Sequence, residues 1–476
     1  MLRDRYPPMN LLALVPAPGM ELDPMLTQID SLLNDDVLFQ AIRADLARRH
    51  PRTLTDGRPS TPIAVRMRML VVKHLYGWSY GQTCQLVSGS LVWRQFCRVY
   101  AEAVPTDTTL LRWANLIQPT TLHAMHDRVV DVARQRKVTR GRKLRIDSTV
   151  VETNIRYPVD RTLLGDGVRV LTRTIQRAKA LLPDDARVSR AAFRNRTRSV
   201  RHVMRQLIDA TRRRGEAAAD ALQAHYRQLV DLTSSVVRQA QHVQAALAEE
   251  SDVRAARLGA TLQAFIPRVR RVIAQTRRRV LQGAQLPASA KLVSSFEPHT
   301  AIIRTGKLGK PTEFGRVVSL DEVEGGIISR YAILAGNPDD ATQLVPSLDQ
   351  HIGRFGRAPD LLVADGKVAT PAHEQIAKQR GVRRVVLPKG GRKTAARQAH
   401  ERQKWFRRGR NWRAGIEGRI SGLKRRHKLD RWRDHGDDGM ERWVGWGIIT
   451  HNLRAIAQAT VDAKKHLTPH VGFMPF

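Results

Sequence analysis

The side chain that stands out for its chemistry is a carboxylate, Glu417, inside the most basic stretch of the chain. Between residues 378 and 433 there are 21 Lys and Arg residues against three acids. On a helix turning about 100° per residue, Arg413 lies about 40° and Lys424 about 20° from Glu417, so the three share one face. An exposed ion pair on a basic helix would have the same spacing and would contribute little to stability. This face alone leaves a structural and a catalytic interpretation open.

Two aspartates stand in segments that otherwise favour apolar residues. Residues 144–151 alternate and are rich in β-branched side chains, which predicts a strand with Asp147 near its middle. Asp365 ends the apolar run 361–364 and precedes Gly366, so we expect it at the carboxyl end of a buried strand, where ligands bind in α/β sheets. The two aspartates and the glutamate lie too far apart in the sequence for a local loop site. Any shared site must therefore be made by the fold.

Grouped carboxylates have a clear chemical use in a basic protein. They can hold divalent metal ions against a phosphodiester, and two Mg²⁺ ions about 3.5–4 Å apart can activate the attacking oxygen and stabilise the leaving one. Arg413 and Lys424 can engage phosphates beside such a site. Other acids that are close to these motifs in sequence are weaker candidates for ligands: Glu152, Asp160, Asp166 and Asp360.

Charge and composition indicate a polyanionic partner. The formal net charge is +37, and besides the 378–433 stretch, residues 171–290 carry 23 basic against nine acidic side chains. These charges point to DNA, RNA or an acidic membrane face. No apolar stretch reaches the roughly 20 residues of a membrane span, and prolines and Asp4 around the short apolar run near the start argue against a signal peptide. The two cysteines, Cys84 and Cys97, have no metal-ligand spacing, so we expect buried thiols in a reducing cytoplasm.

The periodicity changes along the chain and predicts several domains in an α/β protein. We expect a mixed sheet flanked by helices, with an all-α N-terminal domain and a long helical insertion. The predicted ranges are 1–24 for a flexible N-terminus, 25–135 for a helical DNA-binding or assembly domain, 136–168 and 291–460 for the core, 169–290 for a basic helical insertion, and 461–476 for a C-terminal tail.

Short apolar runs predict the remaining strands, and heptad-like spacing predicts the insertion. After the first strand, we expect strands at 314–320, 326–334, 360–364 and 382–387, with a helix over 340–355. Apolar residues from Leu222 to Leu247 and from Leu258 to Val272 advance by threes and fours. Residues 249–252 can turn the chain between these two helices, and Pro267 is expected to bend or end the second one. The arginines of this insertion are either a solvated surface or a DNA contact.

The acidic motifs resemble those of bacterial insertion-sequence transposases of the DDE class. The first-Asp region of that family is similar to residues 147–160 and 163–167, and the second to 363–366. Around the third acid the family pattern is Tyr, two residues, Arg, three residues, Glu, six residues, Lys. Arg413, Glu417 and Lys424 match it, and Arg410 stands in the place of the Tyr. The resemblance spans roughly residues 25–460.

This resemblance implies an RNase H-like catalytic core, with Asp147, Asp365 and Glu417 as catalytic ligands of Mg²⁺, or of Mn²⁺ in its place. The implied partner is double-stranded DNA, both the terminal inverted repeats of the element and the target, bound by a homodimer or larger assembly in the bacterial cytoplasm. The residues expected to bind DNA are Arg413, Lys424, Arg419, Arg425 and Arg426. Two other functions stay open: a metal-dependent nuclease of the same fold, and a noncatalytic DNA-binding protein.

Overall fold

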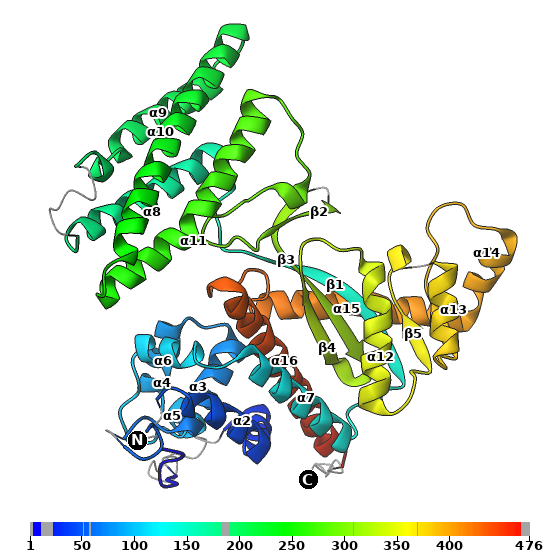
Figure 1. Ribbon diagram of the computed structural model, residues 1–476. Coiled ribbons are helices and arrows are strands. Elements are labelled where there is room, and N and C mark those ends of the chain that lie inside the picture. Colours follow the sequence, from blue (N-terminus) through cyan, green and yellow to red (C-terminus); the bar gives the residue numbers. More distant parts are fainter. Residues whose placement is uncertain are drawn as a thin grey trace, which may run out of the picture. The chain divides into compact units, whose positions relative to one another are not determined.

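A computed structural model of the protein describes residues 3–10, 22–50, 52–56, 59–182, 190–307, 309–368 and 370–467. Most of the expected flexible N-terminus, namely residues 1–2 and 11–21, lies outside the described residues. The chain forms two compact units (Figure 1). The first comprises Met1–Glu152, Val317–Leu334 and Pro338–Phe476, and the second comprises Thr153–Arg316 and Ala335–Asn337.

The N-terminal part of the first unit is helical, as the sequence predicts. Its helices are α1 Pro24–Leu32, α2 Asp36–Ala47, α3 Ile63–Tyr76, α4 Tyr80–Gly89, α5 Leu91–Cys97, α6 Asp107–Ala114 and α7 Pro119–Gln135. Local signals set several of the boundaries. Gly77 ends α3 in the left-handed conformation, and Ser79 forms a capping box with Gln82 at the start of α4.

A mixed sheet of six strands follows. The strands are β1 Lys143–Glu152, β2 Ala301–Lys307, β3 Lys310–Val323, β4 Ile327–Leu334, β5 Leu361–Val363 and β6 Arg384–Val386. Their order is β2-β3-β1-β5-β6, with β4 also paired to β3. β1, β5 and β6 run parallel, whereas β3 runs antiparallel to both β2 and β4. The strands expected from the apolar runs are confirmed, and β2 is an additional strand that the sequence analysis missed.

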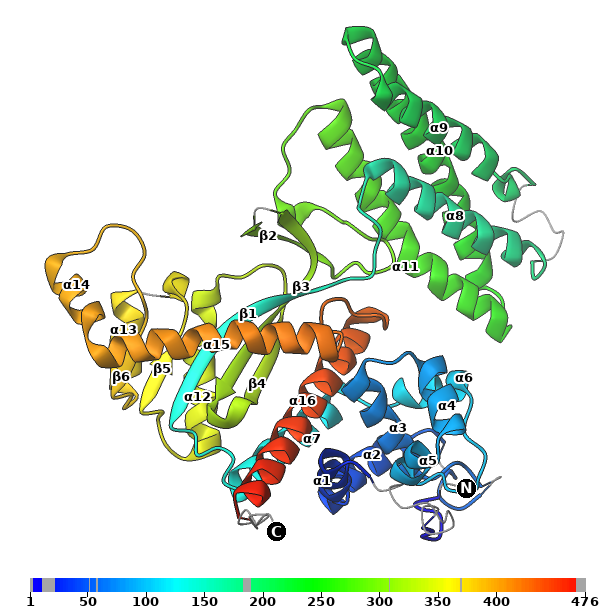
Figure 2. The ribbon, with the colours of Figure 1, turned by 180° about the vertical axis from the view of Figure 1, so that it is seen from behind.

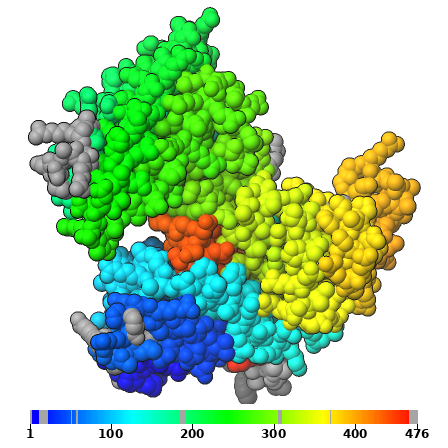
Figure 3. All heavy atoms as spheres, in the orientation of Figure 1, coloured from blue at the N-terminus to red at the C-terminus, as the bar shows by residue number. Residues whose placement is uncertain are grey.

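Two helices of the first unit cover opposite faces of this sheet. They are α12 Leu344–Phe355, seen in front of the strands in Figure 1, and α15 Lys404–Arg426, seen in front of them from behind in Figure 2. In the space-filling view, the part of the first unit that contains α12 is yellow (Figure 3). The two faces have separate cores: Leu144 and Leu362 belong to the cluster with Leu348 of α12, whereas Val363 packs with Phe406 of α15.

The remaining helices of the first unit complete its architecture. They are α13 Pro371–Gln379, α14 Ala395–Arg402 and α16 Gly436–Leu467, with short 3-10 turns η5 Glu324–Gly326, η6 Asp340–Gln343 and η7 Gly366–Val368. The expected helix over 340–355 is confirmed as η6 followed by α12. α16 continues to Leu467, so the segment expected as a tail from residue 461 begins within a helix, and residues 468–476 lie outside the described part of the chain.

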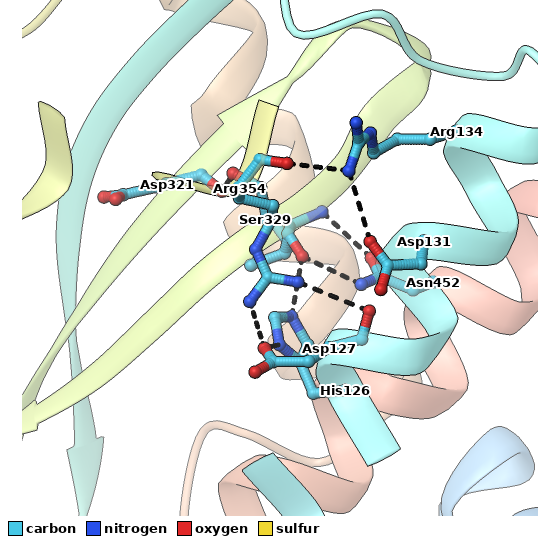
Figure 4. A network of polar contacts seen from close by, with 9 residues as sticks. His126, Asp127, Asp131, Arg134, Asp321, Ser329, Arg354 and Asn452 are labelled. Atoms are coloured by element: carbon cyan, nitrogen blue, oxygen red, sulfur yellow. Dashed lines mark hydrogen bonds and ion pairs between the residues drawn. The ribbon is translucent and has the colours of Figure 1, made fainter. Parts of the chain in front are cut away.

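A polar network joins β4 to the helices around it (Figure 4). Asn452 of α16 accepts from the backbone N–H of Ile328 at 2.9 Å and donates to its carbonyl oxygen at 2.8 Å. His126 Nε2 of α7 also lies 2.8 Å from that carbonyl. Arg354 of α12 forms an ion pair with Asp127 of α7. These contacts fix the helices against the sheet. They also satisfy the buried backbone N–H and carbonyl groups of Ile328 with hydrogen bonds.

The second unit is a helical bundle together with β2 and the first half of β3. Its helices are α8 Asp160–Lys179, α9 Thr197–Arg212, α10 Glu216–Ala248 and α11 Val253–Thr276, with short helical turns η2 Arg190–Phe193, η3 Arg277–Leu281 and η4 Ala288–Ala290. They share one apolar core and lie side by side in Figures 1 and 2.

The two expected helices of the insertion and the turn between them are confirmed in this unit. The turn over residues 249–252 separates α10 from α11, as predicted. Pro267 lies inside α11 and does not end it. α8 was not predicted, and the unit begins at Thr153 and extends to Arg316, beyond the expected insertion limits of 169–290. Among the residues that the structure describes, none of the helices has the length and apolar character needed to cross a bilayer.

Candidate active site

Strand alternation and register bring Asp147 and Asp365 to one place. Successive residues of a strand point to opposite faces, so Asp147 shares the α15 face with Arg145. Asp365 follows the end of β5 by two residues, and its contact with Arg413 of α15 places it on that face too. The parallel strands β1 and β5 pair Arg145 with Val363. Asp147 comes two residues after Arg145, and Asp365 comes two residues after Val363. The two acids therefore reach the same side of the sheet at the neighbouring strands β1 and β5.

The guanidinium of Arg413 lies between the two carboxylates. Its Nη2 is 3.6 Å from Asp147 Oδ2 and 3.6 Å from Asp365 Oδ1. Both distances exceed normal hydrogen-bond length, so these are ion pairs without a directed hydrogen bond. Within the described part of the chain, Arg413 Nε is buried without a hydrogen-bond partner. The arginine thus offsets part of the negative charge of the two acids but is not hydrogen-bonded to either of them.

The surroundings of Asp147 disfavour a free negative charge. Burial raises the pKa of this carboxyl, and the nearby Asp365 and Asp340 carboxylates raise it further, whereas the backbone N–H of Ser148 and the guanidinium of Arg413 lower it, with a net upward shift. The Asp147 side chain is 16% exposed and that of Asp365 is 44% exposed. The pair therefore combines a buried carboxylate that gains from a cation with a second one that solvent can reach.

Asp340 is a site neighbour that the sequence analysis missed. It lies in η6, at the beginning of the α12 segment, and its Oδ1 accepts a hydrogen bond of 2.7 Å from Ser148 Oγ. In the sequence, Asp339 and Asp340 are typical of a helix start, and Asp339 does cap η6. Only the fold shows that the side chain of Asp340 contacts Ser148 of β1.

Glu417 lies on the same helix as Arg413, one turn further on. Its side chain is exposed. Across the described residues, no three His, Cys, Asp or Glu side chains come close enough together to hold a metal ion. The structure thus brings Asp147 and Asp365 together around Arg413 but does not gather Glu417 with them.

The other residues expected to bind DNA fall at different places on α15. Lys424 is half-buried, and Arg425 and Arg426 are exposed at the end of the helix. Arg419 turns to the sheet, where its Nε lies 3.3 Å from Glu322 Oε1.

A buried ion pair fixes α15 against the sheet. Arg145 donates to both oxygens of Glu322, at 2.6 and 3.0 Å, and the two side chains are only 6% and 2% exposed. A further nitrogen of Arg145 donates to the backbone carbonyl of Trp412. Because Trp412 immediately precedes Arg413, this contact sets the position of Arg413 over the two aspartates. Arg145 and Glu322 are positioning residues that the sequence analysis did not identify.

The approach of Arg145 to the helix requires a glycine. A Cβ placed at Gly415 would lie 2.8 Å from Arg145 Nη1. In an exposed helix interior, Gly→Ala stabilises by about 1 kcal/mol. We expect Gly415→Ala to lower the unfolding temperature instead, because Arg145 is held by Glu322 and cannot withdraw. Thermal unfolding measures the change, and Gly418→Ala on the same helix, where an added Cβ meets nothing within 4 Å, is the matched control. Equal stabilisation by both substitutions would contradict this role for Gly415.

Glu401 organises the basic segment before α15. It accepts hydrogen bonds from Lys393 Nζ at 2.5 Å, from Arg397 Nε at 2.8 Å and from the backbone N–H of Lys389 at 3.0 Å. Burial alone would raise its pKa, but these three donors outweigh burial and lower the pKa to about 2. Because the folded-state pKa lies below the unfolded value, Glu401 stabilises the fold fully above about pH 4.5.

That stabilisation is lost as the pH falls toward 2. We therefore expect Glu401→Gln to reduce the free energy of unfolding at pH 7, and the difference from the wild type to shrink between about pH 4.5 and 2. Urea unfolding at several pH values measures it. A difference that stays constant over this range would show that the carboxylate charge contributes nothing.

Comparison with known proteins identifies the N-terminal region. Residues 10–116 match the profile of a family described as a transposase domain, DUF772. This match covers α1 to α6 and ends before the sheet. No curated protein and no solved structure matches the chain.

Proposed function

We propose that this protein, which carries a transposase domain at residues 10–116, is a DDE transposase. In this proposal it binds the terminal inverted repeats of its own element, cleaves DNA strands there and joins the freed 3′ ends to target DNA. The catalytic residues are Asp147, Asp365 and Glu417. Both reactions are in-line displacements at a phosphodiester, so one site can perform them in turn without a covalent enzyme intermediate.

The observation that carries the proposal is the pair Asp147 and Asp365 with a cation between them. The two carboxylates meet although they are far apart in sequence, and each lies 3.6 Å from the same guanidinium nitrogen. A place that holds one positive charge between two carboxylates suits another cation, and oxygen donors are what Mg²⁺ and Mn²⁺ prefer. Glu417 shares a helix face with Arg413, which supports it as the third ligand.

Asp147 and Asp365 meet at one place and fit a divalent ion by their donor chemistry, and Glu417 offers the same oxygen chemistry from α15. Asp147, Asp365 and Glu417 would hold Mg²⁺ or Mn²⁺, and the bound ion supplies Lewis-acid activation of the attacking water or hydroxyl. The chain's own contribution is positional. Arg145 and Glu322 hold the start of the 413–417 turn in place, and Arg413 balances the aspartates and is able to bind a phosphate oxygen of the DNA.

The sheet supports an RNase H-like identity for the core. It joins an antiparallel pair, β3 and β4, to the parallel strands β1, β5 and β6, with helices on both faces. The acids lie on the first strand, after β5 and on a helix that crosses one face of the sheet. This arrangement agrees with the core that the sequence motifs imply.

Double-stranded DNA is the proposed partner, bound at both the element ends and the target by a homodimer or larger assembly. The net charge of +37 supports a polyanion. In the second unit, Arg198, Arg201 and Arg205 are exposed on α9 while Val200 and Val203 face the core, so the arginines of this helix are available to phosphates.

A single assay tests the proposal against its rivals. The purified protein is incubated with Mg²⁺, a target plasmid and labelled DNA taken from the two sides of its reading frame. A transposase cleaves the labelled ends and joins them to the plasmid. Cleavage without joined product would indicate a metal-dependent nuclease. Binding without any Mg²⁺-dependent cleavage would indicate a noncatalytic DNA-binding protein.

A further inference from the structure

A second basic feature of the first unit lies on the other side of α15 from the two aspartates. It is a cavity of about 720 Å³ lined by the C-terminal half of α15 and by α16. Four arginines line it: Arg419, Arg425, Arg426 and Arg454. We call it the arginine pocket.

The charge of the arginine pocket is largely uncompensated. Arg419 shares Glu322 with Arg145, and Asp462 is the acid among the lining residues. Arg425 and Arg426 are exposed at the rim. Within the described chain, neither they nor Arg454 form a side-chain hydrogen bond or ion pair. Several guanidinium groups facing one cavity repel each other, so the arrangement favours an anion with more than one charge.

The helix geometry separates this pocket from the candidate active site. Measured from Arg413 at about 100° per residue, Glu417 lies at about 40° and Lys424 at about 20°. The pocket residues Gly418, Gly422 and Arg426 lie at about 140° to 220° on the same helix. The two faces are therefore opposite, and one DNA phosphate cannot contact both.

The pocket lacks an aromatic platform on which a nucleobase could stack. None of its lining residues is Trp, Tyr or Phe, so no aromatic ring is available for base stacking. Its two histidines are buried and already bonded: His427 Nδ1 lies 3.1 Å from the carbonyl of His74, and His451 Nε2 lies 3.0 Å from that of Gly326. Burial lowers the pKa of His427 to about 4 and of His451 to about 3, so neither adds charge at neutral pH. The positive charge comes from the arginines, which suit phosphate oxygens.

Two glycines give the pocket an open floor. Gly418 and Gly422 are one turn apart inside α15 and line the cavity. A Cβ at either position would meet nothing within 4 Å, so packing inside the protein does not require glycine there. Each glycine costs about 1 kcal/mol of helix stability relative to Ala. Because neither glycine has a side chain, the backbone of α15 is uncovered between the arginines. A bulky ligand backbone can therefore approach the helix closely there.

We propose that the arginine pocket binds the phosphodiester backbone of double-stranded DNA, as a contact separate from the DNA at the carboxylates. This deepens the proposed function by adding a second duplex-binding face to α15. It requires DNA binding but no catalysis, so it can fail or hold independently of the cleavage reaction.

Charge removal at the pocket rim is the first test. We expect the double variant Arg425→Gln/Arg426→Gln to bind a short fluorescein-labelled duplex about tenfold more weakly in fluorescence anisotropy. Across about 50–200 mM salt, the slope of log K against log salt should become shallower by about one for each phosphate that the variant no longer neutralises. The matched control, Arg407→Gln/Arg408→Gln, removes the same charge from exposed positions nearer the start of α15. Equal weakening in both variants would overturn a specific role for the pocket.

Filling the pocket is the second test, and it separates binding from folding. Gly422→Leu replaces a weak helix former by a strong one and projects a side chain into open space. We expect a higher unfolding temperature together with weaker DNA binding. Unchanged duplex affinity in this folded variant would overturn the proposal. Strand cleavage measured on the wild type reports separately on the proposed function, because these binding measurements do not depend on it.

Discussion

Asp147→Asn is expected to abolish strand cleavage while the protein stays folded. The substitution removes one of the two carboxylates that meet at Arg413, and with it a proposed ligand for the catalytic ion. We expect a loss of at least about 10³-fold in the cleavage rate, which corresponds to about 4 kcal/mol of barrier. Because burial disfavours the charge of Asp147, the neutral Asn should leave the unfolding temperature unchanged or raise it.

Loss of cleavage without loss of stability distinguishes a catalytic carboxylate from a structural one. Asp365→Asn and Glu417→Gln should give the same loss of cleavage with duplex binding retained. Asp349→Asn is the matched control, because that acid lies on α12 in an exposed ion pair with Arg380 and should affect cleavage little. If any one of the three variants still cleaves DNA at the wild-type rate, that residue is not part of the site.

Glu322→Ala is expected to be strongly destabilising and to reduce cleavage as well. It would leave Arg145 buried with an unpaired charge, which typically costs about 3–5 kcal/mol. Arg145 also holds the carbonyl of Trp412, so its displacement should move Arg413 away from the aspartates. Urea unfolding measures the stability, and the cleavage assay under conditions where the variant is folded measures the site.

A double variant separates the buried charge from the positioning effect. Arg145→Met combined with Glu322→Leu removes both charges and should recover much of the stability lost in the single variant. Cleavage should remain low, because the bond to Trp412 is absent. Full activity in the double variant would show that Arg145 does not position the helix. If Glu322→Ala has the same free energy of unfolding as the wild type, the Arg145–Glu322 ion pair does not contribute to stability.

The sequence predicts where the strands of this fold lie better than it predicts which strands pair with each other. The alternation in residues 144–151 reveals β1 and places Asp147 on it, because period-two patterning is a local property. The register that sets Asp147 beside Asp365 depends on the pairing of β1 with β5, which joins residues more than two hundred positions apart. Local patterns do not contain that information.

Buried charged residues explain why the predicted strand at 314–320 is shorter than β3. The expected strand at 314–320 ends before Asp321 and Glu322, yet β3 continues through both to Val323. The two acids remain in the sheet because they have partners: Asp321 accepts from Ser347 at 2.8 Å, and Glu322 pairs with Arg145. The sequence shows two charged residues at a strand end, and only tertiary contacts make them part of the interior.

The ends of the second unit have a consequence for how such a chain can diverge. Thr153, its first residue, donates a backbone hydrogen bond of 2.9 Å to the carbonyl of Phe314, close to where the unit returns to Val317. β1 and β3, which carry the chain out and back, are neighbours in the sheet. An inserted unit whose two ends lie close together can be lengthened, shortened or exchanged without changing the path of the chain in the rest of the protein. The strand that bears Asp147 can therefore stay constant while relatives acquire quite different appendages between the same two strands.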